Sequence, residues 1–285
     1  MTLFIEILKS ILYGLLQGIT EWLPISSTGH LILLHTVLPL RVFDDPNANL
    51  AFWNMYKVVI QLGSILAVLI LFYRRLWPFS ADLTGKSRKS IIKTWVLILI
   101  ATIPCGIIGF CFNDFVDEKL SSPLVVGIAL IAYGILFLIA ERKDVTTKYK
   151  KVSEITPVTA FLTGLFESLA LVPGTSRSGA TIIGGLLLGM SRPTAAEFSF
   201  FLAIPVMIGA SALKLAKMNT AVPLNGILIL LAGMVTAFVV SVSVIRSLMK
   251  YIKTNSFRIF GFYRIILGII ILILSVLGLI PKGLV

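Results

Sequence analysis

The segment GLLQGITEWLPISSTGHLIL, residues 14–33, decides the fold, because a related segment, GLFESLALVPGTSRSGATII, follows 150 positions later as residues 164–183. Identical or similar residues fall in register, among them Gly14/Gly164, Gln17/Glu167, Ser26/Ser176 and Gly29/Gly179. Two pairs differ in kind, because Ser27 aligns with Arg177 and His30 with Ala180. The similar residues predict that the two segments share one backbone conformation, and the differing residues predict that the segments have different chemical roles.

The composition is that of a membrane protein. Of the 285 residues, 57% are hydrophobic and 13% are charged, whereas about a quarter are charged in soluble domains. The mean hydropathy is +0.99. The formal net charge of +12 lies in loops between apolar runs, which suits anionic membrane lipids as partners and excludes a nucleic-acid partner from our expectations.

Six apolar runs are long enough to cross about 30 Å of hydrocarbon, at residues 51–73, 93–112, 123–140, 198–215, 223–245 and 259–279. Pro24 and Pro173, with nearby glycines, interrupt the two repeated segments. Each segment is therefore predicted to form a re-entrant helical hairpin, which is tolerated at membrane depth only where protein or a polar cavity satisfies its backbone. The predicted fold is an all-α polytopic membrane protein, with six transmembrane helices and two re-entrant hairpins in one membrane domain, residues 1–285.

The distribution of Lys and Arg predicts the topology. These residues concentrate in the loops 74–93, 142–151 and 246–258, which should therefore be cytoplasmic. The loops 41–54, 113–122 and 214–222 hold fewer cations and should face outward, as should both termini. Each half, approximately 1–140 and 155–285, then contains one hairpin and three spans. Because three spans is an odd number, the second half enters the membrane from the opposite side, and the two halves form an inverted-topology repeat. The hairpins are then expected to meet near the midplane, and the site is expected to open to the external side.

The polar side chains of the hairpins suit a phosphate ligand. The runs SSTGH and TSRSG precede apolar runs and resemble helix N-termini, where free N–H groups and the helix dipole favour an anion. Arg177 at membrane depth costs about 2.5 to 3.5 kcal/mol on insertion scales, which implies an anionic ligand or an ion-pair partner such as Glu21 or Glu167. Its planar guanidinium group would bind a phosphate bidentately.

Two spacings indicate further chemistry. Ser27 and His30 are three residues apart, so on one helix face the imidazole would be placed to accept the serine proton. Gln17 and Glu21, four residues apart, share a face, and Glu21 is an oxygen ligand suited to a divalent cation that bridges to phosphate. The alternatives are a helix-capping cluster for residues 26–28 and a hydrogen-bonded core histidine for His30. Tyr263 and Arg264 lie near a predicted helix end, where snorkelling explains them.

These residues resemble the undecaprenyl-diphosphatase family, also called the bacitracin-resistance protein family, of bacterial inner membranes. The resemblance covers the whole chain. It rests on the pattern (E/Q)xxxExLPxSSTGHL at residues 17–31, on QLGSILAV at 61–68, on PGTSRSGATI at 173–182 and on an SRxxAxEFSF-like run at 191–200.

The resemblance implies a phosphatase, dependent on Mg²⁺ or Ca²⁺, that removes the terminal phosphate of undecaprenyl diphosphate and so recycles the lipid carrier of peptidoglycan synthesis. It implies Ser27 as nucleophile, His30 as its base or the leaving-group acid, and Glu21 with Gln17 as metal ligands. The expected diphosphate-binding residues are Ser26, Thr28, Ser176, Arg177, Ser178 and Thr181. Many relatives carry glutamate at position 17 and often glutamine at position 167. A homodimer is a further expectation.

Two other functions compete with this one. Inverted repeats with broken helices are common in secondary transporters, so a polyprenyl-phosphate transporter or flippase is the alternative, although transport requires no nucleophile beside a base. The STGH run also invites comparison with type-2 phosphatidic-acid phosphatases. Their SRx5Hx3D signature fails here, because Ile183 stands where that signature requires histidine.

Overall fold

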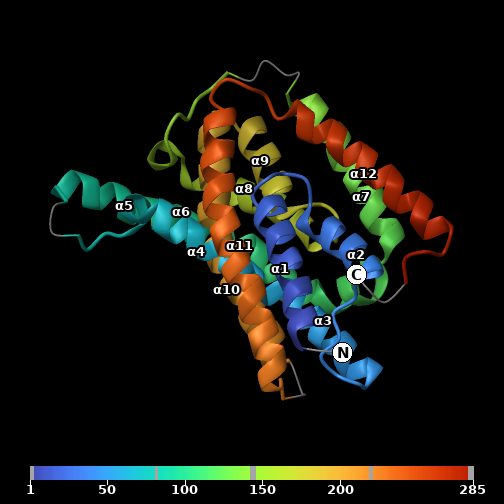
Figure 1. The fold of residues 1–285 in the computed structure, drawn as a ribbon. Coiled ribbons are helices and arrows are strands. Elements are labelled where there is room, and N and C mark those ends of the chain that lie inside the picture. The colour runs from blue at the N-terminus through green and yellow to red at the C-terminus, as the bar shows by residue number, and fades with distance from the viewer. Residues whose placement is uncertain (1–2, 81–82, 142–145, 218–220, 282–285) are drawn as a thin grey trace.

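The computed structural model describes residues 3–80, 83–141, 146–217 and 221–281 (Figure 1). It confirms the all-α prediction, because the named elements of these residues are all helices. The α-helices are α1 (Leu3–Thr20), α2 (Ser27–Val37), α3 (Pro46–Val59), α4 (Gln61–Leu71), α5 (Tyr73–Leu76), α6 (Gly85–Phe115), α7 (Pro123–Ala140), α8 (Pro157–Ser168), α9 (Arg177–Leu187), α10 (Arg192–Ala216), α11 (Leu224–Tyr251) and α12 (Arg258–Val276). A π-helix, Val116–Leu120, follows α6, and short 3-10 turns precede and follow α8.

Seven helical segments among the described residues are long and apolar enough to cross a membrane. Six of them coincide with the predicted spans to within a few residues at each end or extend beyond them, with α3 and α4 together forming one. The seventh is α1, of which only residues 14–20 belong to the segment that the sequence analysis predicted to form the first hairpin. Helix α6 begins eight residues before the predicted span at residue 93, because a helix that continues past the hydrocarbon can carry charged residues on its extension.

Each repeated segment forms two helices joined by a turn. In the first, α1 ends at Thr20 and α2 begins at Ser27; in the second, α8 and a 3-10 turn precede α9, which begins at Arg177. Ser26 and Ser176 have φ angles of 72° and 68° and are the non-glycine residues with positive φ among those described. This conformation is unusual for a residue with a Cβ atom. Its recurrence at equivalent positions supports the predicted shared backbone, while the re-entrant placement of the hairpins stays a prediction.

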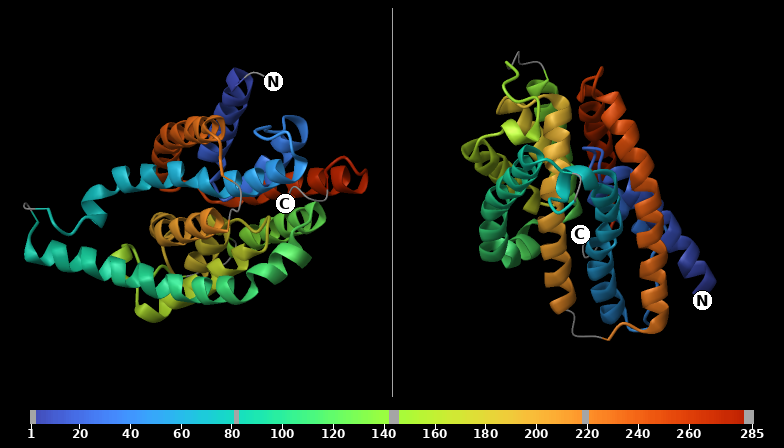
Figure 2. Two further views of the ribbon diagram at one scale, coloured as in Figure 1. Left: turned by 90° about the horizontal axis from the view of Figure 1, so that it is seen from below. Right: turned by 90° about the vertical axis from the view of Figure 1, so that its left-hand side faces the viewer.

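The hairpin of each half packs against a helix of the other half. Helix α1 packs against α11 of the second half, and α8 packs against α6 of the first half (Figure 2). The repeat-equivalent glycines lie at these contacts, since a Cβ atom on Gly14 would overlap the carbonyl oxygen of Gly233 and one on Gly164 would overlap that of Ala101. Helices α7 and α12 pack side by side (Figure 1). Each hairpin is thus positioned by the opposite half of the chain.

The three cation-rich loops meet at one end of the molecule. Residues from all three, among them Arg74, Lys86, Lys151 and Lys250, line one cleft of about 1140 Å³. Arg142 and Lys143 lie outside the described residues. A second cleft, of about 740 Å³, is lined by most residues of the segment 41–50, among them Arg41 and Asp44, and by Asn225. Asn225 and Lys250 lie near opposite ends of α11, about 38 Å apart at 1.5 Å per residue. The cation-rich loops and the cation-poor loop at residues 41–50 therefore lie on opposite sides; which side is cytoplasmic stays a prediction.

Candidate functional site

The turns of the two hairpins enclose a cavity of about 170 Å³. The first hairpin contributes Glu21, Ser27 and Thr28 to its wall, and the second contributes Glu167, Ser176 and Arg177. The remaining wall is mostly apolar and comes from the turn of the second hairpin, residues 170–174, and from α4, α6 and α10. Residues about 150 positions apart in the sequence thus face one small space, as expected if the two hairpins meet.

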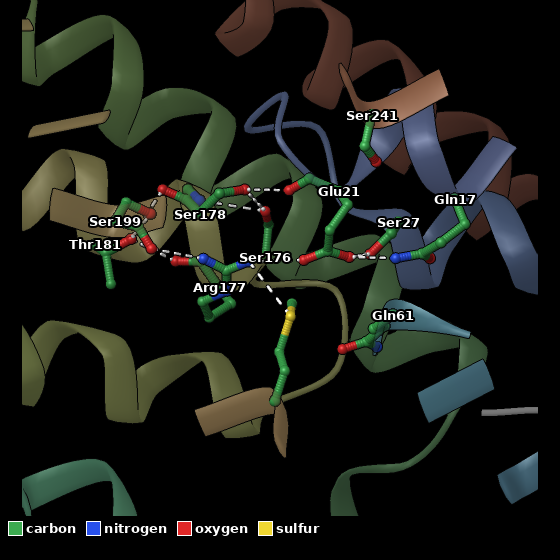
Figure 3. A network of polar contacts seen from close by, with 12 residues as sticks. Gln17, Glu21, Ser27, Gln61, Ser176, Arg177, Ser178, Thr181, Ser199 and Ser241 are labelled. Atoms are coloured by element: carbon green, nitrogen blue, oxygen red, sulfur yellow. Dashed lines mark hydrogen bonds and ion pairs between the residues drawn. The ribbon is translucent and has the colours of Figure 1, made fainter. Parts of the chain in front are cut away.

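Glu21 is the centre of the polar network beside this cavity (Figure 3). Its Oε1 accepts a hydrogen bond from Arg177 Nη2 at 2.9 Å. Its Oε2 accepts one from Ser27 Oγ at 2.8 Å and another from Gln17 Nε2 at 2.8 Å. Both Ser27 and Arg177 are therefore oriented by one carboxylate, which is only 4% exposed.

Arg177 is held on several sides. Its Nη1 donates to the carbonyl oxygen of Ser199 at 2.8 Å, and its guanidinium carbon lies 5.5 Å from the centre of the Trp22 ring. Its Nε has no hydrogen-bond partner among the described residues. The ion pair with Glu21 that the sequence offered as an alternative to phosphate binding is present, but Arg177 also lines the cavity. The structure therefore allows both roles.

The predicted phosphate-binding hydroxyls fall into two groups. Thr28 and Ser176 line the cavity. Ser26 Oγ accepts a hydrogen bond from the Gly29 N–H, and Ser178 Oγ donates to the carbonyl oxygen of Glu21 at 3.0 Å. Thr181 Oγ1 donates to the carbonyl oxygen of Arg177 at 2.9 Å. The second group therefore holds the turns and helix starts in place, and its predicted contacts with phosphate stay predictions.

The structure does not bring His30 to Ser27. His30 Nδ1 lies 2.7 Å from the carbonyl oxygen of Ser26, and Nε2 lies 2.6 Å from the hydroxyl oxygen of Tyr263. The imidazole also stacks on the Tyr263 ring. Because the Ser27 hydroxyl donates to Glu21 instead, the geometry favours the Glu21 carboxylate as the proton acceptor for Ser27.

The snorkelling interpretation of Arg264 is wrong, because this side chain is completely buried. Its Nη1 donates to the carbonyl oxygen of Pro24 at 3.2 Å. Its Nη2 donates to those of Gly174 at 3.0 Å and Thr175 at 2.8 Å. Arg264 thus fastens the turn of one hairpin to the turn of the other. Its position inside the apolar span Arg258–Val276 was the available signal, since an ionisable residue at membrane depth needs partners.

Three polar residues at the cavity or in contact with Arg177 lay outside the predicted set of site residues. Gln61, at the start of α4, lines the cavity. Glu167 also lines it, is completely buried, and has no hydrogen-bond partner for either carboxylate oxygen among the described residues. Ser199 positions Arg177 through its backbone, as described above. Of these, Glu167 was visible in the sequence as an acidic residue at the repeat position of Gln17.

The donor set fits a divalent cation. Mg²⁺ and Ca²⁺ prefer carboxylate and carbonyl oxygens. Glu21 supplies a carboxylate, and Gln17 Oε1 is buried without a hydrogen-bond partner among the described residues. A carboxylate has about four lone-pair positions, so the three hydrogen bonds to Glu21 leave room for a metal contact. The predicted ligands Glu21 and Gln17 are therefore compatible with such an ion.

Known proteins resemble this chain over nearly its whole length. The family model described as "Bacitracin resistance protein BacA" matches residues 10–270. The chain is 50% identical over 268 residues to undecaprenyl-diphosphatase 1 of Clostridioides difficile (strain 630), covering 94% of this chain and 96% of the relative. It is 46% identical over 276 residues to an undecaprenyl-diphosphatase of Enterococcus faecalis, covering 95% and 98%. The match extends over nearly the whole chain, including both hairpins, and this protein belongs to the bacitracin resistance protein BacA family.

Proposed function

We propose that this protein is an integral-membrane phosphatase that hydrolyses undecaprenyl diphosphate to undecaprenyl phosphate and inorganic phosphate. The observation that carries the proposal is the hydrogen bond from Ser27 to Glu21 beside Arg177, in a cavity between two helix starts. A hydroxyl beside a carboxylate and a guanidinium group is an arrangement for nucleophilic attack on a phosphate. The names of the relatives point to the same substrate.

In the proposed mechanism, Ser27 Oγ attacks the terminal phosphorus and its proton passes to Glu21 Oε2. The bond between that phosphorus and the bridging oxygen breaks, and undecaprenyl phosphate leaves. Arg177 stabilises the negative charge on the phosphoryl oxygens as the bond breaks. Water then hydrolyses the phosphoserine, which releases inorganic phosphate and restores the Ser27 hydroxyl. The free N–H groups at the starts of α2 and α9 favour the anionic substrate throughout.

Mg²⁺ or Ca²⁺ is the proposed cofactor, and Glu21 with Gln17 would hold it. When bound, such an ion neutralises charge on the diphosphate and holds its oxygens in place. The chain's own contribution is to keep Glu21 fixed through the hydrogen bonds described above.

The proposed location is the cytoplasmic membrane of a bacterium, with the cavity opening to the external side in the predicted topology. The substrate is a lipid, and the exposed apolar faces of the long helices are suited to contact with membrane lipids and with its polyprenyl chain. The expected homodimer stays a prediction. The transporter alternative does not account for the hydrogen bond from Ser27 to Glu21, since moving a phosphate group requires groups that bind it but no nucleophile.

Phosphate release from undecaprenyl diphosphate by the purified full-length protein in lipid vesicles tests this function. We expect release that stops when a chelator removes divalent cations and resumes when Mg²⁺ or Ca²⁺ is added, because the diphosphate must approach the Glu21 carboxylate. Full activity in excess chelator would contradict the metal assignment. The absence of release under every metal condition, from protein that is folded, would contradict the proposed function.

A further inference from the structure

Glu167 is a buried carboxylate without a partner. It lies one residue before the end of α8 and is completely buried. Neither of its side-chain oxygens has a hydrogen-bond partner among the described residues. An ionised carboxylate in that condition is among the costliest groups to bury, so it requires a cation or a proton nearby. Because Glu167 lines the same cavity as Glu21 and Arg177, a ligand in the cavity is in position to supply that partner.

The charges around the cavity favour a cation as that partner. Of its described lining residues, three are charged: the carboxylates of Glu21 and Glu167 and the guanidinium group of Arg177. With all three ionised, the lining side chains carry one net negative charge, which opposes the attraction of the two helix starts for a phosphate. A divalent cation reverses the sign of that charge, and it is also the kind of ion that bridges carboxylates to phosphate oxygens. A cation bound to both carboxylates therefore makes the cavity attractive to a phosphate.

The repeat supplies an independent argument about geometry. Glu167 occupies the position in the second hairpin that Gln17 occupies in the first. Both side chains are completely buried, and Gln17 Oε1 also lacks a hydrogen-bond partner. Gln17 donates to Glu21 through its amide nitrogen, so its unpartnered oxygen lies beside the same carboxylate. Two equivalent positions thus present unpartnered oxygens, one neutral and one acidic, from opposite hairpins.

We propose that Glu167 is a carboxylate ligand of a divalent cation in the central cavity, acting together with Glu21 from the other hairpin. The cation site then spans both hairpins instead of lying within the first, and each half of the chain contributes one carboxylate. This assignment rests on the proposed function for its role, because the cation is the one that neutralises the diphosphate. Its test, however, needs no substrate.

The test is binding of Mn²⁺ alone to the purified full-length protein, measured from the electron paramagnetic resonance signal of free Mn²⁺. Glu167→Gln keeps the size of the side chain and removes its charge. We expect its affinity for Mn²⁺ to fall at least about tenfold, because losing a group that supports a metal site typically costs that much. Glu6→Gln is the matched control, because Glu6 is a buried carboxylate on α1 about 16 Å along the helix from Gln17 at 1.5 Å per residue. Its Mn²⁺ affinity should equal that of the unmodified protein.

Thermal unfolding distinguishes this role from a purely structural one. Without divalent cation, Glu167→Gln should unfold at a temperature equal to or above that of the unmodified protein, because the substitution removes a buried charge that lacks a partner. With Ca²⁺ added, the unmodified protein should become more stable, and the variant should gain much less. A variant that is less stable without cation, and that gains as much from Ca²⁺ as the unmodified protein, would overturn the proposal.

A charge exchange between the hairpins completes the test. Gln17→Glu combined with Glu167→Gln restores one acidic residue to the pair of equivalent positions, so Mn²⁺ affinity should recover toward that of the unmodified protein. Unchanged Mn²⁺ affinity in Glu167→Gln alone would overturn the proposal, since it would mean that the carboxyl group is a neutral acid. If Glu167→Gln lowers Mn²⁺ affinity but the unmodified protein releases no phosphate from undecaprenyl diphosphate, the ligand assignment is supported and the proposed function is contradicted.

Discussion

Replacing Arg177 with alanine is expected to abolish binding of a diphosphate analogue and to lower turnover by at least about 100- to 1000-fold, as the loss of one preorganised donor to a developing charge does. The guanidinium group acts on the ground state and on the transition state alike, because the phosphate carries negative charge in both. Affinity and turnover should therefore fall together. The measurements are phosphate release and the affinity of a non-hydrolysable diphosphate analogue.

Arg177→Lys is the matched control, since it keeps the charge but cannot reproduce a planar bidentate contact. We expect it to retain more analogue affinity than Arg177→Ala and to remain impaired in turnover. Each variant should first be shown to be folded by thermal unfolding, because the substitution leaves Glu21 buried without its ion-pair partner. Normal analogue affinity in folded Arg177→Ala would contradict the role of Arg177 as the phosphate-binding group.

Glu21→Ala is expected to be far more damaging than Gln17→Ala. Glu21 accepts hydrogen bonds from Ser27, Gln17 and Arg177, so its removal frees all three groups and leaves a buried guanidinium group unpaired. Breaking such a pair costs about 3 to 5 kcal/mol, which corresponds to a loss of about 100-fold or more in rate if it acts on the transition state. Gln17→Ala removes one hydrogen bond, worth about 1 kcal/mol, and one neutral metal contact whose loss saturating Mg²⁺ offsets, so it should cost less than about tenfold.

Phosphate release at saturating Mg²⁺ measures both losses. Glu21→Gln separates the two roles of the carboxylate, because the amide retains a hydrogen-bonding oxygen for Arg177 but is a poor proton acceptor for Ser27. We expect turnover of Glu21→Gln to be close to that of Glu21→Ala. Equal losses in Gln17→Ala and Glu21→Ala would show that the formal charge at position 21 is not the dominant contribution.

The repeat made much of the site predictable. Residues that recur 150 positions apart must adopt related backbones, and the shared positive φ of Ser26 and Ser176 is a direct consequence. The helix starts at Ser27 and Arg177 followed from runs of capping residues before apolar runs. Since an arginine at membrane depth needs an anion, a contact between Arg177 and a carboxylate such as Glu21 could also be anticipated.

The partners of individual side chains were less accessible to prediction. The three-residue spacing places Ser27 and His30 on neighbouring positions of α2, but it says nothing of what packs against that face. The turn before α2 brings Glu21 to Ser27, and α12 brings Tyr263 to His30. For the same reason Arg264 resembled a snorkelling residue, although it contacts carbonyl groups of two turns that are about 90 and 240 positions away in the chain. Such contacts depend on packing between distant helices, which local spacing does not encode.

The central claim is that Ser27 is the nucleophile of a diphosphate-binding site formed by both hairpins. Phosphate release by Ser27→Ala from undecaprenyl diphosphate, measured alongside its affinity for a non-hydrolysable diphosphate analogue, tests that claim most directly. Because Arg177 and the helix starts remain, the account predicts that Ser27→Ala binds the analogue with nearly unchanged affinity and releases no phosphate above background. Near-normal phosphate release by Ser27→Ala would contradict the account and would leave His30 or a metal-bound water as the attacking group.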